Sequence, residues 1–326
     1  MARRRRRKPP EDEEEPARPL LGGWLRDVLV ALVIVGVVFA GIFAYARVWP
    51  PLVVIESESM QHADAESYVG VIDTGDLVLV QTTPDRADVV TWAQGRVSGH
   101  STYGDYGDVI VFRRPRDPRP TPVIHRAILY LIPNGTGSWD VPDLDRANGF
   151  PSSEWEGKGA NWAPAVSPFA LREVTIHRMG FARNLVITFN LTRLASLGGS
   201  PPVAGFVTMG DHNAYFGCTP TAECESQGYD HGWVVPLGNI VGKARGEIPW
   251  FGLLKLTLAP TDACCAGWGD GRAPRNSWDL LAVSLVALVA LPFLSEGLSW
   301  AWRTRLGPWV RARLRRGPAP DPDEES

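Results

Sequence analysis

The sequence predicts a mainly β domain between two membrane-spanning helices. Two apolar stretches predict the helices: Val28–Ala46 lies near the N-terminus and the shorter Leu280–Leu294 lies near the C-terminus. Between them, short runs rich in Val, Ile and Phe alternate with Gly, Pro and Asp, as strands alternate with turns. At 326 residues the chain is long enough to bury a substantial core.

The first apolar stretch has the length of a transmembrane helix. Val28–Ala46 carries no charged residue and approaches the roughly 20 residues that cross a bilayer. No cleavage site with small residues follows it before Arg47, so we expect a retained helix rather than a removed signal peptide. Trp24 and Trp49 flank it, as tryptophans do at membrane interfaces.

The second stretch is shorter and more polar. Leu280–Leu294 contains Ser284 and Pro292, and an extension to Trp302 takes in Glu296. A second crossing is the favoured interpretation, and an interfacial or buried helix is the alternative. Basic residues precede the first stretch and follow the second, and such residues stay in the cytoplasm. We therefore expect a two-span protein of the cell membrane, with both termini in the cytoplasm and the domain between the spans outside.

The expected organisation has six parts. They are a charged cytoplasmic tail (1–24), a transmembrane helix (25–49), an extracytoplasmic β-rich domain (50–258), a linker (259–277), a second transmembrane helix (278–302) and a basic, then acidic, cytoplasmic tail (303–326). Within the domain, residues 133–170 are dense in Gly, Pro, Ser, Trp and Asn, which predicts an inserted surface segment. Ile248–Leu258 is apolar but too short to span, so we expect it to lie against the membrane.

The strands of the domain are expected where branched and aromatic residues gather. These runs are Leu52–Ile55, Asp76–Gln81, Val109–Phe112, Val123–Leu131, Leu185–Phe189, Phe206–Met209 and Asn239–Val241. No stretch of useful length in this region shows helical periodicity.

The four cysteines fit an oxidising compartment. Cys218 and Cys224 bracket a short loop and suit a disulfide. Cys264 and Cys265 are adjacent, and we do not expect them to pair with each other. No paired CxxC motif is present, so the sequence predicts neither a zinc site nor any other cofactor.

A serine shortly after the first span is a candidate nucleophile. Ser59 stands in IESESM, and a serine hydroxyl needs a neighbouring base to become a nucleophile. The lysines of the chain are Lys8, Lys158, Lys243 and Lys255. None lies on a strand shortly after Ser59, whereas His125 does, in VIHRAI. The expected general base is therefore a histidine rather than a lysine, and His125 is one of the six histidines of the chain.

Four sequence blocks, in this order, resemble the type I signal peptidases, specifically the archaeal and endoplasmic-reticulum branch. The blocks are IESESM (Ile55–Met60), GDLVLV (Gly75–Val80), GDVIVFRRP with VIHRAI (Gly107–Pro115 and Val123–Ile128) and VTMGDHN (Val207–Asn213). The resemblance covers chiefly residues 25–131 and 203–258. In the bacterial branch a lysine fills the position of His125.

The resemblance implies a fold and a set of roles. It implies a signal-peptidase-like coiled β-sheet domain, with Ser59 as the nucleophile and His125 as the base. The Ser59 backbone N–H and the Ser57 hydroxyl would form the oxyanion hole, which needs hydrogen-bond donors.

The chain departs from the family pattern beside the nucleophile. The family usually has Ser-Gly-Ser-Met followed, one residue later, by Pro. Here Glu58 replaces the Gly and His62 replaces the Pro, which bears on the geometry of the turn.

A second departure concerns the acid. The family has one aspartate in Gly-Asp and another six residues later. Here Asp211 matches the first position, but the later position is Gly217. We infer an inserted loop that ends near Asp230. Either Asp230 or Asp211 is expected to orient His125, as the third member of a triad does.

The resemblance implies a membrane-bound serine endopeptidase that removes signal peptides. Its expected partners are preproteins that carry a signal peptide, membrane lipid and the protein translocation channel, and no nucleic acid is expected. One alternative is another serine peptidase of this fold, such as a self-cleaving LexA-like protein, although those use a lysine base and usually carry a DNA-binding domain. The other alternative is a membrane-anchored β domain without activity.

Overall fold

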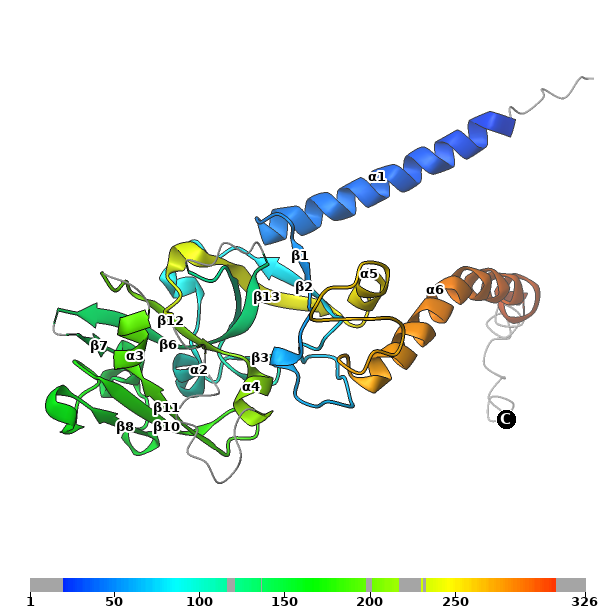
Figure 1. Ribbon diagram of the computed structural model, residues 1–326. Coiled ribbons are helices and arrows are strands. Elements are labelled where there is room, and N and C mark those ends of the chain that lie inside the picture. Colours follow the sequence, from blue (N-terminus) through cyan, green and yellow to red (C-terminus); the bar gives the residue numbers. More distant parts are fainter. Residues whose placement is uncertain are drawn as a thin grey trace, which may run out of the picture. The chain divides into compact units, whose positions relative to one another are not determined.

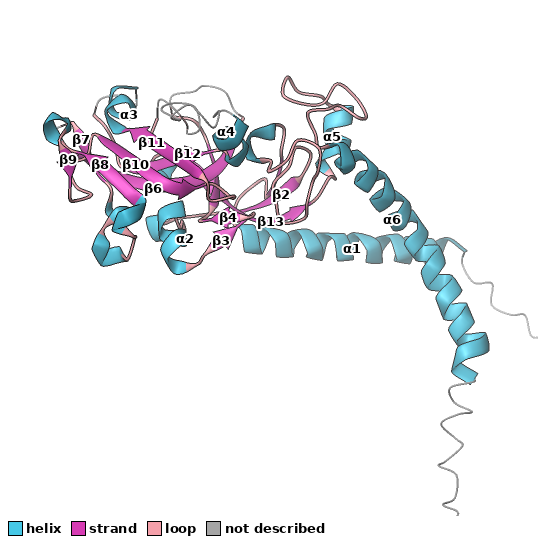
Figure 2. Ribbon diagram, turned by 90° about the horizontal axis from the view of Figure 1, so that it is seen from below, coloured by secondary structure: helices cyan, strands magenta, loops and turns pink. Residues whose placement is uncertain are grey.

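The computed structural model describes residues 20–115, 121–135, 137–197, 201–216, 230 and 233–308 (Figure 1). The chain divides into two compact units, residues 1–47 and residues 48–326. Each unit is described by itself below. Strands are confined to the second unit, between α1 and α6 in the sequence (Figure 2).

The first unit consists of one long helix. α1 spans Leu20–Ala46, and its apolar side chains point outward: Leu32 is 65% exposed and Val37 is 67% exposed. The helix is long and apolar enough to cross a membrane. It includes the predicted apolar stretch Val28–Ala46 and begins eight residues before it.

A main antiparallel sheet organises the second unit. Its strand order is β1-β2-β13-β5-β6-β12, and β7 pairs with β6. The bounds are β1 Leu52–Val54, β2 Leu77–Gln81, β5 Val109–Phe112, β6 Val123–Asn134, β7 Ser138–Asp140, β12 Gly205–Met209 and β13 Ile240–Ile248. Six of the seven expected strands fall in this sheet and the seventh is β11, which confirms a largely β domain.

A second sheet contains part of the segment predicted as a surface insertion. Its order is β11-β10-β8-β9, with bounds Leu185–Asn190, Glu173–Met179, Trp155–Lys158 and Pro164–Ala165. The segment forms short strands and 3₁₀ turns. Trp139 is 2% exposed and packs in one cluster with Ile128 of β6 and Ile176 of β10. The burial comes from short strands and turns, whose apolar residues follow no regular period.

Short helices complete the domain. They are α2 (Trp92–Ser98), α3 (Leu191–Leu197), α4 (Asp211–Phe216) and α5 (Gly252–Leu258), and a small hairpin joins β3 (Ser101–Thr102) to β4 (Asp105–Tyr106). Each helix has two turns or fewer, which is too short for periodicity to reveal. α2 shows a local signal, because Thr91 and Gln94 form a capping box at its start.

The C-terminal part packs on itself before its last helix extends outward. Leu253 and Leu256 of α5 are buried against Trp278 and Leu281 of α6 (Arg275–Ala301). The inner face of the segment expected to lie on the membrane is therefore covered by protein. Leu258 at its end is 86% exposed.

The rest of α6 is apolar and exposed. Val286 is 68% exposed and Phe293 is 71% exposed, and Arg275–Leu306 is long and apolar enough to cross a membrane. Few side chains of α6 are buried, and these lie in its first turns, so most of the helix is not a buried core helix.

One expectation about the cysteines is wrong. Cys264 and Cys265 form a disulfide with each other, across a cis peptide bond that brings their Cα atoms to 3.1 Å. Cys218 and Cys224 lie outside the described residues.

Candidate functional site

Ser59 lies on a single turn of 3₁₀ helix that follows β1. This turn, η1, spans Glu58–Met60, and its last residue, Met60, is buried. Ile55 is tied to the Gly75–Asp76 turn by backbone hydrogen bonds of 2.9 Å in both directions. The Gln61 side chain accepts a 3.2 Å hydrogen bond from the Thr74 N–H. The segment Ile55–Gln61 is therefore held at both ends by the turn before β2.

His125 points from β6 toward an aspartate. It lies opposite Ile110 of β5, and its side chain is 7% exposed. Its Nδ1 is 2.7 Å from Oδ2 of Asp230. Because a carboxylate oxygen only accepts, Nδ1 is the donor in this bond, and Nε2 makes no hydrogen bond within the described residues.

Asp230 is itself fixed by β12. Its N–H donates a 2.9 Å hydrogen bond to the carbonyl of Thr208, and the Thr208 hydroxyl donates to its Oδ2. Thr208 pairs with Ala127 of β6. The same two strands therefore carry His125 and hold its carboxylate partner.

Gly210 lies close to both Ser59 and His125. A Cβ atom at Gly210 would clash with the carbonyl oxygen of Ser59 and would lie 3.0 Å from Nε2 of His125. Only glycine leaves the space that both neighbours use. The Ser59 hydroxyl is 3.3 Å from the Ser57 hydroxyl, and among the described residues no hydrogen bond joins Ser59 to His125.

Asp211 has other partners. Its side chain is 3% exposed and accepts hydrogen bonds of 2.9 and 2.5 Å from Arg126 and one of 3.1 Å from His62. Burial favours the neutral acid, but the charge and hydrogen bonds of Arg126, assisted by His62, lower the pKa of Asp211 to about 2. Asp211 is thus ionised and bonded to Arg126, whereas Asp230 contacts His125.

Sequence reasoning missed Arg126 and Thr208. Arg126 is fully buried, and besides Asp211 it bonds backbone carbonyls between β3 and β5, such as that of Thr102 at 2.9 Å. The signal was present, because an arginine inside the apolar run VIHRAI needs a buried carboxylate partner. Thr208 carried no comparable signal.

The described lysines are engaged with groups other than Ser59. Lys243 contacts the carbonyl of Asp88 and lies 3.3 Å from Asp108. Lys158 pairs with Glu173, and Lys255 pairs with Glu56, each at 2.7 Å. No group of three or more metal-ligating side chains suited to a metal ion occurs in the described part of the chain.

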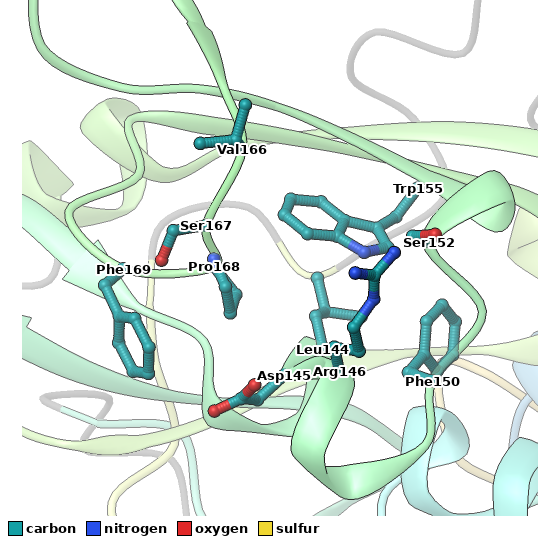
Figure 3. Close-up of a pocket in the computed structure, with 10 residues that line it drawn as sticks. All are labelled: Leu144, Asp145, Arg146, Phe150, Ser152, Trp155, Val166, Ser167, Pro168 and Phe169. Atoms are coloured by element: carbon teal, nitrogen blue, oxygen red, sulfur yellow. The ribbon is translucent and has the colours of Figure 1, made fainter.

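A separate pocket with a volume of about 380 Å³ lies between residues 144–155 and 166–169 (Figure 3). Its wall includes the aromatic rings of Phe150, Trp155 and Phe169. None of the residues around Gly210 lines it.

No protein-family model matches this chain, and comparisons with curated proteins and with solved structures find no match. Function is therefore inferred from the sequence blocks and from the contacts described above.

Proposed function

We propose that this chain is a membrane-bound serine endopeptidase that removes signal peptides from secreted and membrane preproteins, as the type I signal peptidases do. The observation that carries the proposal is the arrangement around Gly210, which adjoins the Ser59 carbonyl and Nε2 of His125 while Nδ1 of His125 bonds Asp230. A nucleophile, a base and an orienting acid are the parts that acyl transfer requires. The antiparallel main sheet is compatible with the coiled sheet expected of that family.

The proposed reaction passes through an ester. Nε2 of His125 removes the Ser59 hydroxyl proton as Oγ forms a bond to the scissile carbonyl carbon. The imidazolium, stabilised by Asp230, then gives that proton to the leaving amine as the C–N bond breaks. The mature chain leaves, and His125 deprotonates a water that hydrolyses the signal-peptide ester on Ser59.

The oxyanion would be bound at the start of η1. Ser59 lies in the first turn of η1, where a backbone N–H has no partner within the helix. The Ser57 hydroxyl is the second donor, and it already lies beside Oγ of Ser59. These two donors could stabilise the charge of the tetrahedral intermediate.

Substrate binding would use the edge of the main sheet. β1 is an edge strand and leads directly toward Ser59. An extended peptide that pairs with β1 would run past the nucleophile. Two helices able to cross a membrane would keep the site near the lipid from which signal peptides arrive, with the translocation channel as a further partner.

The second candidate is a membrane-anchored β domain without activity. The observation in its favour is that the Ser59 hydroxyl contacts Ser57 rather than His125. Catalytic hydrogen bonds often tighten only when substrate binds, so this contact is compatible with either function.

Cleavage of a preprotein by the detergent-solubilised full chain separates the two. We expect the wild type to release the mature chain, and both Ser59→Ala and His125→Ala to abolish release. His177→Ala is the matched control, because His177 stands in a second Ile-His-Arg triplet on β10. A Ser59→Ala variant that cleaves like the wild type, or a wild type inert on several preproteins, would contradict the proposal.

A further inference from the structure

His62 follows Ser59 closely, at the position where the signal-peptidase resemblance leads us to expect a proline. Its ring is held from two sides. Nε2 lies 3.1 Å from Oδ2 of Asp211, and the ring stacks on Phe181 with centroids 3.9 Å apart and planes inclined by 13°. The His62 side chain is only 12% exposed.

Phe181 is at the tip of the hairpin that joins β10 to β11 in the second sheet. Its other neighbour is Tyr215 of α4, with ring centroids 4.1 Å apart. The Tyr215 hydroxyl accepts a hydrogen bond from the Ala182 N–H and donates one to Asn184, both 2.8 Å long. The hairpin tip is therefore fastened to α4 at several points.

Two further contacts fix the same tip. Arg183 pairs with Asp105, and its guanidinium lies 3.8 Å from the ring centre of Tyr106. Gly180 has φ of +75°, and a Cβ atom there would lie 2.8 Å from the Tyr215 ring. A side chain at Gly180 would therefore be both strained and crowded against Tyr215.

α4 links these contacts to the proposed nucleophile. It begins at Asp211, directly after Gly210, where an added Cβ atom would clash with the Ser59 carbonyl oxygen. Between Ser59 and His62, Met60 and Gln61 are 1% and 2% exposed. Motion of the His62 ring would therefore be transmitted to the Ser59 turn.

We propose that His62 is a positioning residue for Ser59, and that the tip of the β10–β11 hairpin belongs to the catalytic site because it holds the His62 ring. This inference rests on the proposed peptidase function. Two features outside the family resemblance, the histidine at 62 and the second sheet, contact each other here. A planar ring supported by Phe181 and Asp211 replaces the stiffness that a proline would give.

A double-mutant cycle on preprotein cleavage tests the inference. The variants are His62→Gln, Phe181→Leu and the double variant, in the detergent-solubilised full chain. We expect each single change to lower kcat about tenfold, because a small displacement of a reacting group is costly, and to leave KM within about twofold. If both act through one stack, the double variant should also lose about tenfold rather than about a hundredfold.

Three comparisons separate positioning from a loss of folding. Phe181→Tyr keeps a planar ring and should retain at least about half of kcat. His62→Phe keeps the stack without the Asp211 bond and should retain more activity than His62→Gln. Phe169→Leu, an aromatic residue of the separate pocket (Figure 3) with no ring partner among the described residues, should behave like the wild type. Thermal unfolding of every variant reports folding.

Independent effects of His62 and Phe181 that multiply to about a hundredfold would overturn this inference, as would wild-type kcat in either single variant. Should Phe181→Leu fail to fold, equal activity of His62→Phe and His62→Gln would overturn it. Cleavage that survives Ser59→Ala would instead overturn the proposed function, and this inference with it. Cleavage that is lost in Ser59→Ala, together with a multiplicative cycle, would overturn this inference alone.

Discussion

Two adjacent residues of β6, His125 and Arg126, each contact a different one of the two candidate aspartates. Successive side chains of a strand point to opposite faces, so His125 and Arg126 face different surroundings. His125 contacts Asp230, and Arg126 contacts Asp211. The sequence left the choice of acid open, because the residues inserted before Asp230 change the spacing between the two aspartates. The distance of each aspartate from His125 could therefore not be predicted.

Replacement of each aspartate by asparagine should have different consequences. We expect Asp230→Asn to lower kcat for preprotein cleavage about a thousandfold or more, because the asparagine amide favours the wrong tautomer of His125. Its unfolding midpoint should stay close to that of the wild type. Steady-state kinetics and thermal unfolding of the same preparation provide both measurements.

Asp211→Asn should act mainly on stability. It leaves the fully buried Arg126 without a charged partner, and loss of one member of a buried pair costs about 3–5 kcal/mol of unfolding free energy. Denaturant titration measures this cost. A stable Asp211→Asn variant with a thousandfold loss of kcat would instead assign the orienting role to Asp211.

Asp73 should make stability depend on pH. Burial raises its pKa to about 7, although Ser67 and His62 partly oppose the shift. An unfolded aspartate has a pKa near 3.9, so the stabilising protonation is complete below about pH 4 and is lost as the pH rises through 7. The wild type should therefore unfold more readily at pH 8 than at pH 5.

Asp73→Asn removes this titration and should make the decline between pH 5 and pH 8 shallower. Thermal unfolding midpoints across that range test it. Some decline should persist, because burial also raises the pKa of Asp76 to about 8. Identical slopes for Asp73→Asn and the wild type would show that Asp73 is not the titrating group.

At the scale of elements, the main sheet was predictable and most of the second sheet was not. The strands of the main sheet are compact runs of branched residues, for example Val109–Phe112, so composition alone locates them. β8 has the sequence WEGK, and its Gly157 fits beside Leu171 where a Cβ atom would be crowded. Such a fit depends on residues distant in sequence, so no local pattern could reveal it.

In the candidate site, too, some features could be predicted from the sequence and others could not. Ser59 and His125 stand in recognisable blocks, and the lysine inventory together with the block resemblance predicted His125 as the base before any geometry was known. The His62–Phe181 stack depends on a hairpin from the second sheet, so it could not be predicted. β11 was the predicted strand of that sheet, whereas β10 was missed although Val174 and Ile176 alternate with polar residues.

Packing of Trp139, a residue of β7, against the second sheet should contribute strongly to folding. This residue is 2% exposed, and its Nε1 donates a 2.9 Å hydrogen bond to the Leu191 carbonyl. Trp139→Ala should lower the unfolding free energy by about 3–5 kcal/mol. Trp162 belongs to the same segment but is 47% exposed, so Trp162→Ala should change it by no more than about 0.5 kcal/mol. Similar values for the two variants in denaturant titration would contradict the packing described here.

At the scale of the whole molecule, two exposed apolar helices bracket the folded domain in the sequence. An isolated helix whose apolar residues are mostly exposed is unfavourable in water, and α1 and much of α6 have this character. Basic residues lie before α1 and after α6 in the chain. The length of both helices and the position of these charges favour two crossings with both ends on the cytoplasmic side.

Protease protection in sealed membrane vesicles tests this topology. With a different epitope tag at each terminus, right-side-out vesicles should lose the central domain to added protease while both tags remain protected inside. Each tag should stay on a fragment about as long as its helix and tail, and detergent should expose both. Digestion of the C-terminal tag without detergent, while the N-terminal tag survives, would mean that α6 does not cross. The second apolar helix would then lie at the membrane surface, and α1 alone would anchor the domain that carries Ser59.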